Sequence, residues 1–180
     1  MTRCLPGSGW IHRFRGTRRT AMTIKDLMTK DVATVGLEDT AATAARKMWD
    51  CDCGALPVVD GVNKVIGMIT DRDICMAAMH RDVAPSAFRA ADAMSKRVFT
   101  VTETDSLSTA EQLMRDNQVR RLPVVDGNGQ ARGILSLADV VRATELGAGP
   151  SKPISSSDVT STMARIVARP DGIGGQRASH

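Results

Sequence analysis

The sequence predicts a mixed α/β (α+β) protein built from two tandem copies of one β-α-β-β-α unit. Shifting the 180-residue chain by 66 places aligns it with itself without a gap, and about 19 of 51 aligned positions are identical. Within each copy, short apolar runs alternate with stretches of helical apolar spacing. Because one unit is too short to bury both faces of its sheet, we expect the two units to pack through their sheets.

Short motifs recur at matching spacing and set the domain boundaries. The segment LPVVDG at 56–61 recurs at 122–127, and Gly67 is repeated as Gly133. We therefore divide the chain into a basic flexible arm (1–21), a first unit (22–80), a linker (81–89), a second unit (90–146) and a Gly-, Pro- and Ser-rich flexible tail (147–180) with a short helix at 157–168.

Each unit should open with a strand followed by a helix. The strands are expected at 32–35 and 98–101, and Asp39 and Asp105 then stand where they can cap the helices. The helices themselves are predicted by apolar residues at helical spacing. These residues are Ala41, Ala44, Ala45 and Met48 in the first unit, and Leu107, Ala110, Leu113 and Met114 in the second.

Each unit should close with a β-hairpin and a second helix. The Asp-Gly pairs at 60–61 and 126–127 are typical of tight hairpin turns. Thr70 and Ser136 follow the return strands and are natural N-caps for the last helix of each unit. The hairpin strands are expected at 55–59 with 65–69, and at 122–125 with 131–135.

The positive charge is concentrated at the ends of the chain. The net charge is +4, yet residues 22–146 carry 15 basic and 18 acidic side chains, a net charge of −3. Residues 1–21 carry five arginines and no acid. Aromatic residues make up only 3% of the chain, which leaves few rings for stacking bases. The composition argues against a nucleic-acid surface on the folded part, so only the arm could supply one.

The sequence predicts a cytoplasmic protein without a catalytic centre or a metal site. The longest apolar runs are too short to cross a bilayer, and no apolar signal segment opens the chain. The three histidines cannot be combined with a nucleophile into a catalytic set. Cys51 and Cys53 form one weak pair, whereas a zinc site needs four ligands. We therefore expect no enzyme, no metal and no catalytic cofactor.

The two units resemble CBS (cystathionine β-synthase) domains. The resemblance is carried by GALPVVD at 54–60 with GMITDRD at 67–73, and by RRLPVVD at 120–126 with GILSLAD at 133–139. It covers about two thirds of the chain. It implies two domains paired about a pseudo-two-fold axis, with clefts between them that commonly bind AMP, ADP, ATP or S-adenosylmethionine.

The resemblance also implies a regulatory role. Most such modules are regulatory attachments to enzymes, transporters or channels, and two modules often form a homodimer. This chain resembles the bacterial stand-alone kind, a CBS pair with nothing large attached. The expected function is therefore a non-catalytic sensor of an adenosine ligand, acting as a homodimer on an unknown protein partner. The alternative is a structural, scaffolding dimer that does not respond to nucleotides. Binding of nucleic acid through the arm ranks last, because the folded part is acidic.

Two Ser/Thr-x-x-Asp motifs are the candidate ligand sites. Thr70 with Asp73, and Ser136 with Asp139, begin helices directly after strands. A helix N-terminus offers free N–H groups and a positive dipole end, which favour phosphate. The carboxylate can accept hydrogen bonds from both ribose hydroxyls. Spacing alone favours plain helix caps, and the duplication and the family resemblance favour the ligand role.

Arg120 and Arg121 are the candidate phosphate ligands. They precede a strand, and a guanidinium binds phosphate through a rigid fork. The alternative is a solvated basic pair on a turn. The first unit has Gly54 and Ala55 at these positions, so the two clefts should not be equivalent.

By the resemblance, each aspartate works with residues of the other unit. Met68 and Ile134 would add apolar walls to the base pockets, with ordinary core packing as the alternative for them and for the other methionines. The implied sets are Ser136 and Asp139 with Met28, Ala33, Cys53 and Gly54, and Thr70 and Asp73 with Met94, Phe99, Val119 and Arg120.

Overall fold

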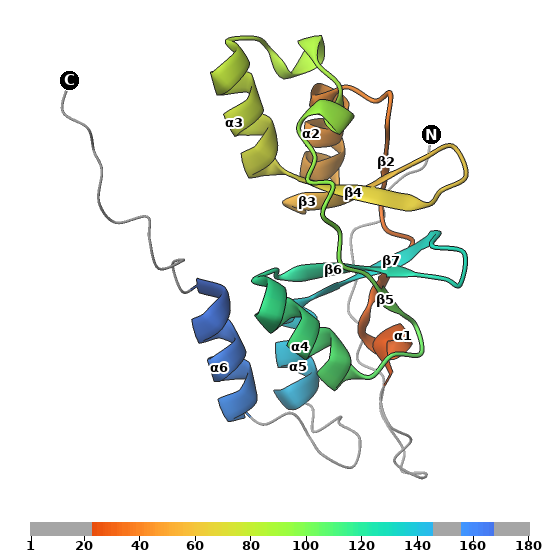
Figure 1. Ribbon diagram of the computed structural model, residues 1–180, viewed down its shortest axis with the longest axis vertical. Coiled ribbons are helices and arrows are strands. Elements are labelled where there is room, and N and C mark those ends of the chain that lie inside the picture. The colour runs from red at the N-terminus through yellow and green to blue at the C-terminus, as the bar shows by residue number, and fades with distance from the viewer. Residues whose placement is uncertain (1–22, 146–155, 168–180) are drawn as a thin grey trace, which may run out of the picture.

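Two small β-sheets face each other, with the longer helices on their outer sides (Figure 1). This computed structural model describes residues 23–145 and 156–167. The α+β class and the two β-α-β-β-α units predicted from the sequence are confirmed. The flexible arm expected at 1–21, and the tail expected on either side of the C-terminal helix, lie outside the described residues.

The elements of the two units follow the same order. The first unit contains α1 (Ile24–Leu27), β1 (Thr29–Lys30), β2 (Val35–Gly36), α2 (Ala41–Asp50), β3 (Ala55–Val59), β4 (Val65–Thr70) and α3 (Asp71–Arg81). The 3-10 turns η1 (Pro85–Ala87) and η2 (Ala90–Asp92) then lead to β5 (Val101–Thr102), α4 (Leu107–Asn117), β6 (Arg121–Val125), β7 (Ala131–Ser136) and α5 (Leu137–Glu145), and α6 (Ser156–Val167) follows.

The hairpins have the same register in both units. Leu56 pairs with Ile69 in the antiparallel pair β3–β4, and Leu122 pairs with Leu135 in β6–β7. The hairpin ends bond reciprocally, since the N–H of Val65 donates to the carbonyl of Gly129 at 3.0 Å and the N–H of Ala131 donates to that of Asn63 at 3.0 Å. Such reciprocal bonding is what a pseudo-two-fold relation requires.

The opening segment of each unit crosses to the other unit. Strand β1 pairs with β7, with Thr29 opposite Ile134, and so joins the four-stranded sheet β1-β7-β6-β5 of the second unit. In return, Ser95 pairs with Met68 on β4, in the sheet β2-β3-β4 of the first unit. Sequence reasoning predicted the order of elements in the two units but could not show this exchange, because it depends on contacts between distant residues.

The exchange extends into the two hydrophobic cores. Ile24, fully buried, packs in the second core with Leu122 and Leu135. Ala90 packs in the first core with Leu56 and Ile69. Full burial of an Ile or Leu side chain stabilises a fold by roughly 1.5–3 kcal/mol. The two units therefore depend on each other for part of their cores.

The helix caps and the opening strands differ from the expectation. Thr40 and Ser106 cap α2 and α4, and not Asp39 and Asp105. Each aspartate lies one residue earlier and bonds backward: the N–H of Gly36 donates to Asp39 Oδ2 at 3.0 Å. The strands expected at 32–35 and 98–101 are shorter and begin three residues later, as β2 and β5, because each pairs with its neighbour at only two positions.

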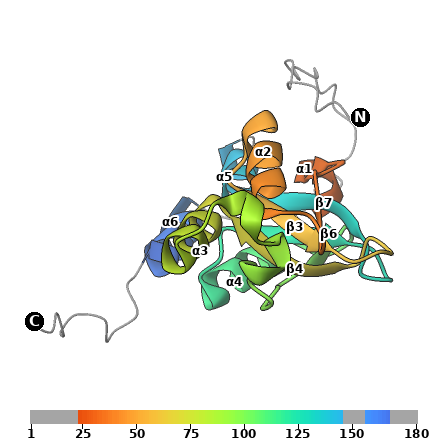
Figure 2. The same cartoon turned by 90° about the horizontal axis from the view of Figure 1, so that it is seen from above.

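Helix α6 covers the outer side of α4 and α5, at the end of the second unit opposite to α1 in both views (Figure 2). It overlaps the helix expected at 157–168. Val159 is buried and Ile166 packs against the second core. The Thr162 hydroxyl donates to Glu111 Oε1 at 2.5 Å in a buried contact.

Candidate functional site

Both Ser/Thr-x-x-Asp motifs form capping boxes at helix N-termini. At α3, the N–H of Asp73 donates to Thr70 Oγ1 at 3.1 Å, and Asp73 Oδ2 accepts from the N–H and the hydroxyl of Thr70 at 3.0 and 2.7 Å. At α5, Asp139 Oδ2 accepts from the N–H and the hydroxyl of Ser136 at 2.8 and 2.6 Å. The predicted helix-cap role is confirmed at both sites.

The second oxygen of each aspartate has a different environment. Arg142 forms an ion pair with Asp139 Oδ1 from one turn further along α5. The Asp139 side chain is only 7% exposed, whereas that of Arg142 is 67% exposed. Asp73 is half-buried. Each aspartate therefore caps its helix with Oδ2, and Oδ1 is left for a second partner, which at Asp139 is Arg142.

Arg120 and Arg121 lie where the second unit's strand β6 begins. Arg120 is exposed and its carbonyl accepts from the N–H of Leu137 at 2.9 Å. Arg121 is half-buried and lies opposite Ser136 in the sheet. Arg121 also acts electrostatically on Cys53 of the first unit. The cationic pair is thus next to Ser136 and close to the first unit.

Cys53, Gly54 and Asp71 form the equivalent corner of the first unit. Burial raises the pKa of the Cys53 thiol, and the cation of Arg121 only partly opposes this. The N–H of Asp71 donates to the carbonyl of Gly54 at 3.3 Å, and a Cβ on Gly54 would lie 3.1 Å from Asp71 Oδ2. Sequence reasoning missed Asp71 as a neighbour of this site. Asp71 aligns with the apolar Leu137 in the repeat, so the duplication gave no signal for it.

Met28 and Met94 lie beside the strands that lead to the two capping boxes. Met28 packs over Gly133 of β7 and Met94 packs over Gly67 of β4, in each case three residues before the capping residue, Ser136 or Thr70. Met68 and Ile134, on the same strands, are half-buried. This placement agrees with the implied grouping of Met28 with Asp139 and of Met94 with Asp73.

The remaining candidates pack against the cores. Ala33 and Cys53 lie against the first core, and Phe99 and Val119 lie against the second. The guanidinium of Arg97 stands over the Phe99 ring, 5.1 Å from its centroid. Core packing accounts for these positions, so a place beside a ligand stays a prediction for each of them.

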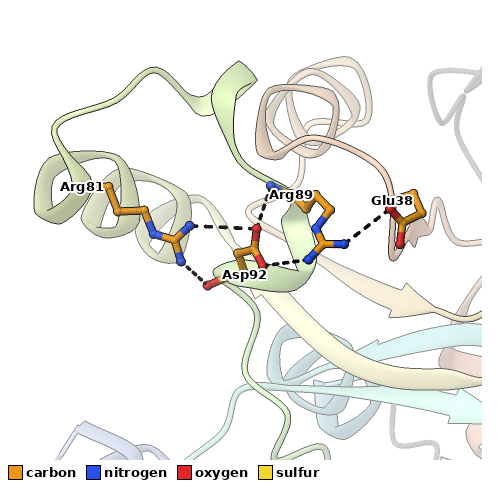
Figure 3. Close-up of polar contacts among 4 residues, drawn as sticks. All are labelled: Glu38, Arg81, Arg89 and Asp92. Atoms are coloured by element: carbon orange, nitrogen blue, oxygen red, sulfur yellow. Dashed lines mark hydrogen bonds and ion pairs between the residues drawn. The ribbon is translucent and has the colours of Figure 1, made fainter.

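A network of ion pairs fixes the segment that carries Met94 (Figure 3). Arg81 of α3 donates to the carbonyl of Asp92 at 3.0 Å. Arg89 contacts Asp92 Oδ1 at 3.4 Å and Glu38 Oε2 at 3.5 Å. The hydrogen bond from the Arg89 N–H, with smaller help from both guanidinium groups, lowers the pKa of Asp92. The network ties η2 to the first unit, two residues before Met94.

The part of the chain that the structure describes contains no group of three His, Cys, Asp or Glu side chains arranged to hold a metal ion. Nor does any helix within residues 23–145 and 156–167 have the length and apolar character that crossing a bilayer requires.

The fold and the paired capping boxes define a tandem-repeat α+β module with exchanged opening segments. The family model of the CBS domain matches residues 24–80 and 90–145, and the chain belongs to the CBS-domain family. It is 42% identical over 120 residues to the CBS domain-containing protein YhcV of Bacillus subtilis (strain 168), which covers 65% of this chain and 81% of the relative. The resemblance stated from the motifs is confirmed.

Two similar solved structures contain adenosine ligands. The CBS domain pair of MJ0100, in complex with 5′-methylthioadenosine and S-adenosyl-L-methionine, has a TM-score of 0.60 and 25% identity, covering 67% of this chain and 98% of that one. CBSX2 in complex with AMP has a TM-score of 0.59 and 26% identity, covering 69% of this chain and 96% of that one.

Proposed function

We propose that the chain is a non-catalytic regulatory module that senses an adenosine-containing ligand in clefts between its two CBS repeats. The ligand classes are AMP, ADP, ATP and S-adenosylmethionine. The observation that carries the proposal is the duplicated capping box: Thr70 with Asp73 and Ser136 with Asp139 stand at equivalent helix N-termini. The two similar structures with adenosine ligands support the same ligand class.

The ligand would be held by its ribose and its phosphate. Oδ1 of the aspartate accepts hydrogen bonds from ribose hydroxyls while Oδ2 keeps the helix cap. The N–H groups of the helix start and the guanidinium groups of Arg120 and Arg121 attract phosphate. The adenine would be lined by Met28, Ala33, Cys53 and Gly54 at one site and by Met94, Phe99 and Val119 at the other. Met68 and Ile134 would add apolar walls to the base pockets.

A thermal-shift titration with AMP, ADP, ATP, S-adenosylmethionine and GTP tests this function. A ligand at 100 times its Kd adds about 2.7 kcal/mol of stability, which corresponds to a shift of a few degrees. We expect a shift that is selective for adenosine ligands and is reduced in Asp73→Asn or Asp139→Asn. These substitutions keep an oxygen for the cap and remove the carboxylate.

Asp26→Asn is the matched control. The N–H of Thr23 donates to Asp26 Oδ2 at 2.9 Å in a capping box of the same type, at α1 and outside the candidate site. This variant should keep the full ligand response. A flat response of the folded protein to all adenosine ligands would contradict the proposed function.

One observation favours the scaffolding alternative. In both motifs Asp Oδ2 already serves the protein's own helix, so the boxes are complete without a ligand. The expected homodimer belongs to either function, and Trp49 and Met79, 86% and 60% exposed, offer apolar surface for it. The protein partner and the cytoplasmic location stay predictions, as does the absence of catalysis.

A further inference from the structure

The two capping boxes differ in the residue one turn after the aspartate. Asp139 is followed by Arg142 and Asp73 by Met76, and these positions correspond in the repeat. Arg142 pairs with Asp139 Oδ1, while Ser136 occupies Oδ2. A methionine cannot pair with a carboxylate, so α3 has no equivalent of this contact.

The pair leaves the Asp139 carboxylate fully engaged by its own helix. Its two oxygens have protein donors, and the side chain is 7% exposed. Asp73 uses Oδ2 for Thr70, and it is half-buried. The two hydroxyls of a ribose need Oδ1 of the aspartate as their acceptor. At Asp139 this oxygen is paired with Arg142, whereas at Asp73 the residue one turn further along the helix is not a cation.

We infer that Arg142 blocks the Asp139 site, because a ligand's ribose must displace the Arg142 guanidinium from Asp139 Oδ1 before the ribose can bind. We call this blocking contact the gate. The inference rests on the proposed function, because it assumes that ribose binds at these aspartates. The Arg142 side chain is 67% exposed, so the released guanidinium can enter water. At the position of Arg142, α3 carries Met76, so we expect the Asp73 site to bind the ribose at the lower ligand concentration.

The effect of Arg142 on the ligand Kd should be modest. Exposed ion pairs shift an equilibrium by up to about fivefold, and we take this range for Arg142 because its guanidinium is largely in water. The Asp139 site should therefore bind ribose about two- to fivefold more weakly than it would without Arg142. This difference is small enough for a ligand to overcome, and it favours filling of the Asp73 site when the ligand carries no phosphate for Arg120 and Arg121 to attract.

A reciprocal exchange of the two residues tests the gate. Arg142→Met is made in the Asp73→Asn background, which isolates the second site, and Met76→Arg is made in the Asp139→Asn background. Adenosine is titrated by calorimetry, since it presents a ribose without a phosphate that an arginine could attract. We expect Arg142→Met to tighten the adenosine Kd about two- to fivefold and Met76→Arg to weaken it by a similar factor.

Two further variants control the experiment. Arg142→Lys keeps the positive charge without the guanidinium fork and should fall between the parent and Arg142→Met. Arg46→Met removes one exposed positive charge from α2 of the first unit and should leave both Kd values unchanged. Thermal unfolding of each variant shows whether it is folded.

The possible outcomes separate the gate from the proposed function. Adenosine binding with the same Kd in Arg142→Met and its parent overturns the gate and leaves the sensor function in place. A failure of the unsubstituted protein and of all variants to bind adenosine or AMP overturns both. Opposite shifts in the two exchanged variants support both.

Discussion

Two strand glycines decide how closely the two units approach. A Cβ on Gly133 would lie 2.5 Å from the carbonyl oxygen of Thr29 and 2.9 Å from Met28 Sδ. A Cβ on Gly67 would lie 3.1 Å from the carbonyl oxygen of Ser95. The glycines of the repeated motif are thus needed where a crossing backbone lies against the sheet, and not because of an unusual φ.

We expect Gly133→Ala to lower the free energy of unfolding by about 1–3 kcal/mol, because β1 or β7 must move to admit the methyl group. Gly127→Ala is the control, since a Cβ there has nothing within 4 Å. Urea unfolding of the two variants measures the difference. Equal stabilities would mean that β1 can shift on β7 at no cost.

Among the elements, the local signals were predicted well and the non-local ones poorly. The hairpins follow from the Asp-Gly turns and the apolar runs beside them, and the caps Thr70 and Ser136 follow from their own short motifs. The strands β2 and β5 exist only through parallel pairing with β3 and β6, which no local pattern encodes. The ion pair between Arg142 and Asp139 was not predicted either, because spacing does not show with which of several acidic side chains an arginine will pair.

Helix α6 makes a buried polar contact with α4 in addition to its apolar packing. Glu111 is 4% exposed, and the Thr162 hydroxyl donates to it at 2.5 Å. We expect Thr162→Val to cost about 1–3 kcal/mol, because it keeps the shape and leaves a buried carboxylate oxygen without its donor. Thr162→Ser keeps the hydroxyl and should cost less. Urea unfolding compares the two, and equal losses would show that packing and not the hydrogen bond holds α6.

The whole molecule is joined by the exchange of opening segments between the units. Strand β1 completes the second sheet, and the N–H of Met68 donates to the carbonyl of Ser95 at 3.0 Å in the first. The ligand sites are proposed along these same crossings, next to Met28 and Met94. A displacement of either crossing segment would therefore change both a proposed ligand site and the packing of a hydrophobic core.

The ion-pair network at Asp92 should make the stability of the contact between η2 and the first unit depend on pH. The Arg89 N–H bonds Asp92 Oδ2 at 3.2 Å and lowers the pKa of that carboxyl in the folded state. A carboxyl with a lowered folded pKa adds stability above its unfolded pKa of about 3.9, and this stability is lost as the pH falls through the folded value. Asp92→Asn removes the charge, so we expect it to be less stable than the parent at about pH 7.

The difference should shrink as the pH falls through the lowered pKa of the folded Asp92, because below it the parent's carboxyl is also neutral. Urea unfolding of both proteins across this range measures it. Asp116→Asn, at an exposed position on α4, controls for the loss of one negative charge elsewhere. A constant difference between Asp92→Asn and its parent would mean that the shape of the side chain, and not its charge, holds η2 against the first unit. A difference that fades with acid, seen for Asp92 and not for Asp116, would place the pH-sensitive link between the two repeats at this network.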